Sequence, residues 1–145
     1  MKKQVKKTKK AQSGRSMIEM IGVLAVMALI TAGAFVLISS ANSSQKRNRA
    51  IDDIMEITAG VRSLYAERDT LPEINSDIVL AAIGKSETGP YSGSKYVVRT
   101  DSATQFSVIL VKMPEKDCQA LEIKNWKDAD DKVCKETDFF VQFSK

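Results

Sequence analysis

The sequence predicts an α+β protein in which a long N-terminal helix, apolar over its first half, packs on a small antiparallel sheet. Three observations predict this fold. An uncharged, mostly apolar run of 19 residues covers 20–38. Helical periodicity resumes after it, and short alternating apolar stretches follow in the C-terminal half. A chain of 145 residues has room for one domain and one further element.

The N-terminal residues hold the basic excess of the chain. Residues 1–14 contain six Lys and no acid, whereas the remaining 131 residues contain 16 Lys+Arg and 18 Asp+Glu, a net charge of −2. Alone, such a tail is read as a solvated segment that contacts nucleic acid or lipid phosphates. The apolar run behind it favours a cytoplasmic leader that orients membrane insertion.

The apolar run is long enough to cross a bilayer. At about 1.5 Å per residue, 19 helical residues span a hydrocarbon core of about 30 Å. A buried core helix is disfavoured, because the rest of the chain is too small to surround it. The positive-inside rule predicts a cytoplasmic N-terminus and export of everything after about Ser40. Ile38-Ser39-Ser40-Ala41 is a poor secretory cleavage site, so we expect a single-pass anchor.

Glu19 is the one acid in the apolar segment. A carboxylate at the centre of a membrane helix costs roughly 2.5 to 3.5 kcal/mol, and such acids are functional candidates. Snorkelling to the head groups would explain how Glu19 is tolerated but not why it is there. If the chain were cut between Gly14 and Arg15, Glu19 would be the fifth residue, one helical turn from a new α-amino group. Its own terminus points away along the axis, which favours pairing with the terminus of a neighbouring copy.

Residues 13–19, Ser-Gly-Arg-Ser-Met-Ile-Glu, followed by an apolar helix, resemble the class III signal of type IV pilins. The match combines a basic leader, a terminal Gly, a Glu at the fifth mature position and the apolar span. The resemblance implies that prepilin peptidase cleaves between Gly14 and Arg15 and N-methylates Arg15. Family members usually carry Phe, Met or Leu where this chain has Arg15. The span lacks the Pro common in the type IVa branch and is most similar to the type IVb branch.

We expect residues 15–40 to form the transmembrane and assembly helix, and residues 41–69 to be the amphipathic half of the same helix. One helix from about Ser16 to Arg68 would be some 80 Å long and would end before Pro72. Its second half has an apolar stripe typical of ordinary core, made of Ile51, Ile54, Met55, Val61, Leu64 and Tyr65. The opposite face is charged, with Asp52, Asp53, Glu56, Arg62, Glu67 and Arg68.

Residues 70–145 are predicted to form a globular α+β head. The expected elements are a helix over 75–82, a loop over 84–93, a hairpin of strands over 95–99 and 105–112, a helix over 115–126 and a last strand over 139–143. In the helix over 115–126 we expect Cys118, Leu121 and either Ile123 or Trp126 to point inward. The acidic residues Asp128, Asp130 and Asp131 lack the spacing of an EF-hand loop and are interpreted as a solvated turn.

Cys118 and Cys134 enclose a 17-residue loop. In an exported head such a pair predicts a disulfide, which for that loop length contributes about 3 kcal/mol. Two reduced core thiols are the alternative if the head is not exported. A Cys-bearing helix followed by a second Cys before the final strand also resembles the type IVb pilins, where the pair frames a disulfide-bounded region, here 118–134.

The sequence gives no sign of an enzyme. Without His there is no Ser–His or Cys–His nucleophile pair, and two Cys cannot complete a four-thiolate zinc site. Neither common Gly-rich phosphate loop is present. We therefore expect no catalytic residues, no cofactor and no bound metal.

The resulting hypothesis is a structural subunit of a type IVb-like pilus, a protein filament of which cell adhesion is one role. The resemblance implies an inner-membrane precursor and then an extracellular pilus on a Gram-negative bacterium. Implied partners are further copies of the chain, prepilin peptidase, the inner-membrane assembly machinery and, before assembly, membrane lipid; nucleic acid is not required. The alternatives are a minor pilin or pseudopilin of a type II secretion or DNA-uptake system, and a membrane-anchored binding protein that keeps its basic tail.

Overall fold

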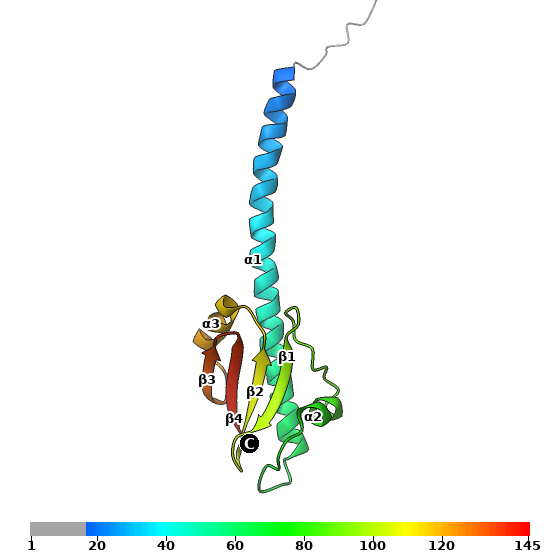
Figure 1. The fold of residues 1–145 in the computed structure, drawn as a ribbon, viewed down its shortest axis with the longest axis vertical. Helices are drawn as coiled ribbons and strands as arrows, with labels where there is room; N and C mark the ends of the chain where they lie inside the picture. Colours follow the sequence, from blue (N-terminus) through cyan, green and yellow to red (C-terminus); the bar gives the residue numbers. More distant parts are fainter. Residues whose placement is uncertain (1–16) are drawn as a thin grey trace, which may run out of the picture. The chain divides into compact units, whose positions relative to one another are not determined.

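The computed structural model describes residues 17–145. The leader 1–14, with Gly14, and the neighbouring Arg15 lie outside the described residues. The chain divides into two compact units, the first ending at Ser39 and the second running from Ser40 to Lys145. The elements, drawn in Figure 1, are α1 (Met17–Leu64), α2 (Ser76–Ala82), β1 (Lys95–Thr100), β2 (Gln105–Val111), α3 (Glu115–Ile123), β3 (Ala129–Lys135) and β4 (Asp138–Ser144).

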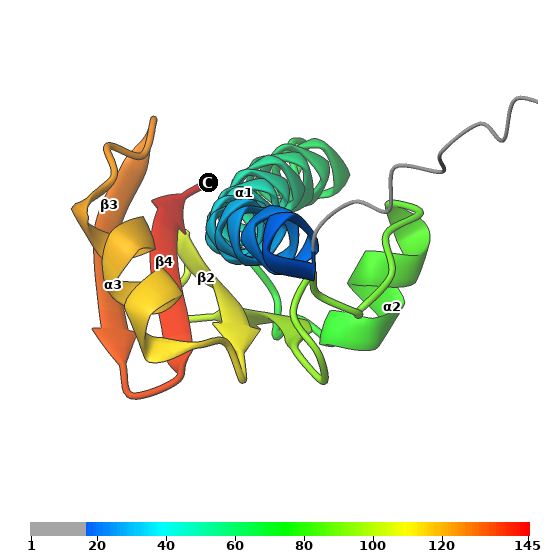
Figure 2. The same cartoon turned by 90° about the horizontal axis from the view of Figure 1, so that it is seen from above.

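The second unit is a four-stranded antiparallel sheet with helices around it. The strand order is β1-β2-β4-β3, so the last strand of the chain is inserted between the hairpin partner β2 and the edge strand β3. Figure 2 shows α3 beside β3 and β4, and α2 away from them on the other side of α1. This is the predicted α+β arrangement of the type IV pilin fold: a long helix, an antiparallel sheet and a C-terminal disulfide.

The core of this unit lies between the sheet and residues 40–64 of α1. Alternate residues of the two central strands point inward, as the two-residue period of a strand requires, and Phe106, Val108, Phe139 and Phe143 are fully buried. On α1 the facing residues are Ile54, Ile57 and Val61, which are also fully buried. Sequence reasoning placed Ile54 and Val61 on this stripe but omitted Ile57.

Helix α2 packs closely on α1 where a glycine permits it. A Cβ added at Gly60 would lie 2.7 Å from Cγ2 of Ile83, the C-cap residue of α2. At the other end of α2, Asn75 accepts hydrogen bonds from the N–H groups of Asp77 and Ile78, at 3.2 and 3.3 Å. Asn75 is therefore the N-cap of α2.

Two helices end earlier than the sequence predicts. Helix α1 ends at Leu64, and not near Arg68. Helix α3 ends at Ile123, which is 84% exposed, whereas Trp126 beyond the helix is the buried alternative. The indole N–H of Trp126 donates to the Leu121 carbonyl at 2.8 Å, so the side chain folds back over the end of the helix.

The predicted solvated turn is correct for Asp128 and wrong for Asp130 and Asp131. Asp128 does lie in a turn, with a φ of 60°, but Asp130 and Asp131 belong to strand β3, which sequence reasoning missed. Both carboxylates are on exposed residues. The strand forms because β4 supplies an antiparallel partner along its whole length, with a register shift between Ala129 and Asp131.

The two edge strands of the sheet, β1 and β3, differ in what prevents a further strand from pairing with them. On β1, the backbone N–H of Tyr96 donates to the Glu87 carbonyl at 2.7 Å, and that of Val98 donates to the Ser76 hydroxyl at 3.0 Å. These outward-directed groups are therefore occupied by the preceding loop and by α2. The other edge strand, β3, is interrupted by the register shift and carries the charged residues Asp130, Asp131, Lys132 and Lys135.

Candidate membrane-anchoring and assembly site

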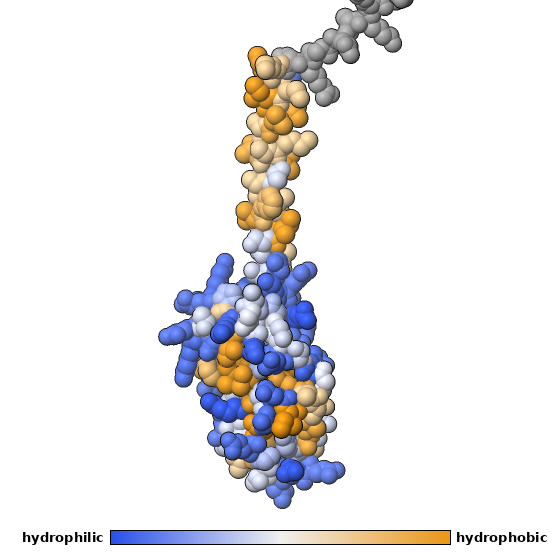
Figure 3. Space-filling view, turned by 45° about the vertical axis from the view of Figure 1, so that its right-hand side comes forward, coloured by the Kyte–Doolittle hydropathy of each residue, from blue (hydrophilic) through white to orange (hydrophobic). Residues whose placement is uncertain are grey.

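The first half of α1 is apolar on all sides. An 18-residue window of α1 has a mean hydropathy of 2.7, none of it is buried, and the helix is long and apolar enough to cross a membrane. Figure 3 shows apolar side chains along the visible face of this half. The exposed large apolar residues are Met17, Ile18, Met20, Ile21, Val23, Leu24, Val26, Met27, Leu29, Ile30, Phe35, Val36, Leu37 and Ile38. An apolar surface of this extent requires cover by lipid or protein.

The polar and small residues of this half suit an environment without water. The Thr31 hydroxyl donates to the Met27 carbonyl at 2.7 Å, which satisfies it inside the helix. Gly22 and Gly33 have nothing within 4 Å of an added Cβ, so contacts within the described chain do not require glycine there. Glycines in membrane helices let a second helix approach closely.

Glu19 lies in the first turn of α1. A carboxylate there is favoured by the positive end of the helix dipole. Among residues 17–145 no cation forms a salt bridge with Glu19. The predicted processing residues Gly14 and Arg15 lie outside the described residues, so their placement relative to Glu19 stays a prediction.

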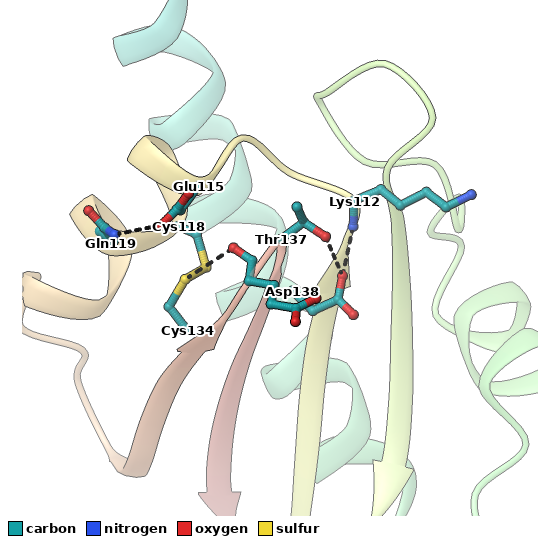
Figure 4. Close-up of a disulfide and its surroundings, with 8 residues drawn as sticks. Lys112, Glu115, Cys118, Gln119, Cys134, Thr137 and Asp138 are labelled. Carbon is teal, nitrogen blue, oxygen red and sulfur yellow. Dashed lines mark hydrogen bonds between the residues drawn. A yellow bond between two sulfur atoms is a disulfide. The ribbon is translucent and has the colours of Figure 1, made fainter.

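The disulfide between Cys118 and Cys134 is present, as predicted, with a Cα–Cα distance of 5.7 Å. Figure 4 shows that it joins α3 to β3. Cys118 is fully buried and Cys134 is half-buried. The bridge thus fixes the helix that covers the sheet to the edge strand that sequence reasoning missed.

Two arginines of α1 hold the head to the helix within the second unit. The Arg47 guanidinium pairs with Asp117 of α3 at 2.9 Å, and the Asp117 side chain is only 7% exposed. Arg62 donates from Nε and Nη2 to the Ser144 carbonyl of β4, at 3.0 and 2.8 Å. The sequence analysis placed Arg62 on the charged face opposite the apolar stripe and gave Arg47 no contact role. The position of Arg62 beside the core residue Val61 was the available signal.

A third contact between the head and α1 is centred on Asp53. Its carboxylate accepts from the Tyr96 hydroxyl at 3.0 Å and from the Lys85 ammonium at 3.1 Å. Burial raises the pKa of Tyr96, and the negative charge of Asp53 raises it further. Hydrogen bonding to Glu56 raises the pKa of Lys85 against the opposing effect of burial.

Each unit has features of its own. The first unit has an apolar helix surface with one carboxylate. In the second unit, ion pairs and hydrogen bonds hold the head to residues 40–64 of α1, and the disulfide joins α3 to β3. Comparison of the chain with protein-family models gives no match, and comparison with curated proteins gives none either.

Proposed function

We propose that this chain is a structural subunit of a type IVb-like pilus. It would be inserted as a prepilin, cleaved by prepilin peptidase between Gly14 and Arg15, and polymerised through the first half of α1. The observation that carries the proposal is one continuous helix, Met17–Leu64, whose first half is wholly exposed and apolar while its second half is covered by a disulfide-bonded head.

The physical argument begins with the exposed apolar surface. A bilayer covers this surface in a monomer, and copies of the same helix can cover it in a filament, so one segment suits both states. Gly22 and Gly33 favour such helix contacts.

Glu19 supplies the specificity of the proposed assembly. Removal of the leader creates an α-amino cation, and Glu19 of an adjacent copy would pair with it in a low-dielectric environment, where such attraction is strong. An unpaired carboxylate in the filament core would be costly, so only the register that pairs the two groups is favoured. N-methylation of Arg15 would keep the terminus cationic.

The proposed locations and partners follow from this role. The precursor would sit in the inner membrane with its N-terminus in the cytoplasm, and the assembled fibre would lie outside a Gram-negative cell. Its partners would be other copies, prepilin peptidase and the inner-membrane assembly machinery.

Glu19→Gln tests the assembly role with little change in shape. We expect the variant precursor to insert and to be cleaved, while the amount of sheared surface fibre falls to background. Asp52→Asn is the matched control, because it removes an exposed acid of the second half of α1 and should leave fibres at the wild-type level. Normal fibres from the Glu19→Gln variant would refute the pairing role.

Mass spectrometry of the membrane and fibre forms tests the processing step. We expect a mature chain that begins at Arg15. An intact Met1 would instead support an anchored protein that retains its basic tail, and a cut after Ala41 would indicate a secretory signal. Fibres in which this chain is only a trace component would favour the minor pilin or pseudopilin.

A further inference from the structure

A hollow of about 450 Å³ opens on the surface of the second unit, near its N-terminal end. It lies between α1, the loop before β1, the connection from β2 to α3 and the turn between β3 and β4. No carboxylate lines it among the described residues. Its lining residues are Lys46, Tyr91, Ser92, Lys112, Met113, Pro114 and Thr137.

Two lysines of the hollow have no acidic partner within residues 17–145. The Lys46 ammonium lies 6.0 Å from the centre of the Tyr91 ring. Figure 4 shows the Lys112 side chain extending away from Asp138, whose carboxylate instead accepts from the Lys112 backbone N–H at 3.0 Å. By contrast, the neighbouring Arg47 on α1 is paired with an aspartate. The hollow therefore has two ammonium groups available to an anion.

Helix α3 adds to the positive character of the same wall. Its N-cap residue is Pro114, which lines the hollow and makes no side-chain capping bond. The positive end of the helix dipole is therefore not neutralised by an N-cap acceptor. The first turn of α3 contains two acids, Glu115 and Asp117. Glu115 accepts from the Gln119 side chain and is drawn well apart from Lys112 in Figure 4, and Asp117 is paired with Arg47.

The position of Lys46 along α1 suits the head-group layer of a membrane. Lys46 follows Ile38, the last large apolar residue of the span, by eight residues, which is about 12 Å of helix. Side chains of a helix tilt in general toward its N-terminus, which here is the end that carries the span. Figure 3 shows hydrophilic side chains gathered around α1 where the second unit begins.

We propose that this hollow binds the phosphate of an anionic phospholipid head group while the chain is inserted in a membrane. The phosphate oxygens would accept from the ammonium groups of Lys46 and Lys112, and the hydroxyls of Ser92 and Thr137 would line the same space. A lysine near an anionic membrane surface strengthens binding about fivefold, so the pair should give about thirtyfold. The proposal rests on membrane insertion and not on fibre assembly, so either can fail without the other.

The full-length chain in nanodiscs that contain equal amounts of phosphatidylglycerol and phosphatidylcholine provides the test. Native mass spectrometry then measures which lipid stays bound. We expect the wild type to retain phosphatidylglycerol and K46Q/K112Q to lose that preference by about thirtyfold. The matched control is K124Q/K127Q, which removes the same charge from two exposed lysines after α3 and should change the preference less than about twofold.

One more variant and a phosphate titration separate a lipid site from a net-charge effect and from a site for free anions. K46R/K112R keeps both charges and should keep the preference, provided that the melting temperature matches the wild type. Equal losses in the K46Q/K112Q and K124Q/K127Q variants would assign the effect to net charge and overturn the proposal. Inorganic phosphate is also titrated into nanodiscs of phosphatidylcholine alone. Saturable binding there that requires Lys46 and Lys112 would assign the hollow to a free anion and overturn the lipid assignment.

Discussion

The two halves of α1 are parts of one helix, but they relate differently to the rest of the chain. No residue from 17 to 39 is buried, whereas the second half buries Ala50, Ile54, Ile57, Thr58 and Val61. The second half also makes ion pairs and hydrogen bonds to α3, β1 and β4. The difference shows that helix formation does not depend on cover by the head. What changes along α1 is the partner that the side chains need: the head for one stripe, and, in the proposed function, lipid or other copies for the whole circumference.

A pair of matched side-chain truncations should show most clearly how the two halves of α1 differ. Ile57 is fully buried and Ile30 is 66% exposed, so the same change to Ala removes core packing in one half only. We expect Ile57→Ala to lower the free energy of unfolding of the head by about 3 to 5 kcal/mol, and Ile30→Ala to change it by less than about 0.5 kcal/mol.

The fluorescence of Trp126, the only Trp and a buried one, reports unfolding by urea of the chain in detergent micelles. Equal losses in the two variants would mean that the head depends on the first half of α1 as much as on the second.

Removal of the disulfide should lower the free energy of unfolding of the head and leave the first half of α1 helical. With Cys118 and Cys134 both changed to Ser, we expect a loss of about 3 kcal/mol, because the unfolded chain regains the entropy of the loop that the bridge closes. Helical circular dichroism from the first half should persist in micelles after the head unfolds. Loss of the whole helical signal together with the head would contradict the independence of the two halves.

For each tyrosine and pH unit, high pH should give the smallest effect, and it should act only through the second half. Burial raises the pKa of Tyr96 and of Tyr91, so the folded head keeps two protons that the unfolded chain releases above its own tyrosine pKa of about 10. The free energy of unfolding should therefore fall above pH 10, by roughly 1.4 kcal/mol per pH unit for each tyrosine. Lys85, whose pKa is also raised, contributes with the same sign.

Urea midpoints between pH 8 and pH 12 measure this slope. Tyr96→Phe should reduce it above pH 10, while below that pH it should cause only a constant loss of about 1 kcal/mol from the missing bond to Asp53. An unchanged slope in the variant would show that Tyr96 does not carry the effect.

Sequence patterns that are local and strong predicted most of the fold. The apolar span, the β1–β2 hairpin, the helix α2 and the Cys pair each depend on residues close in sequence or on a single chemical type. Strand β3 could not be found in this way, because its sequence is mostly charged and its strand state comes from pairing with β4. Beyond the end of α1, the Leu71 N–H donates to the Ala103 carbonyl at 2.7 Å, a contact distant in sequence that no local pattern predicts.

The features of the candidate site were predictable only where they depend on residues close together in the sequence. Glu19 and the apolar span are apparent from spacing, but the proposed partner of Glu19 belongs to another copy. The contacts of Arg47 and Arg62 join residues separated by 70 and 82 positions, and no periodicity reports such pairs.

The protection of the two edge strands limits how copies of this head can associate. An open strand edge invites a neighbouring chain to extend the sheet, which is the route to domain exchange and amyloid. Here the outward N–H groups of Tyr96 and Val98 on β1 are already taken, and β3 has a register shift and exposed charges. Heads crowded at high local concentration are therefore poor templates for one another, and any ordered array of this protein must be joined through side-chain surfaces and not through a shared sheet.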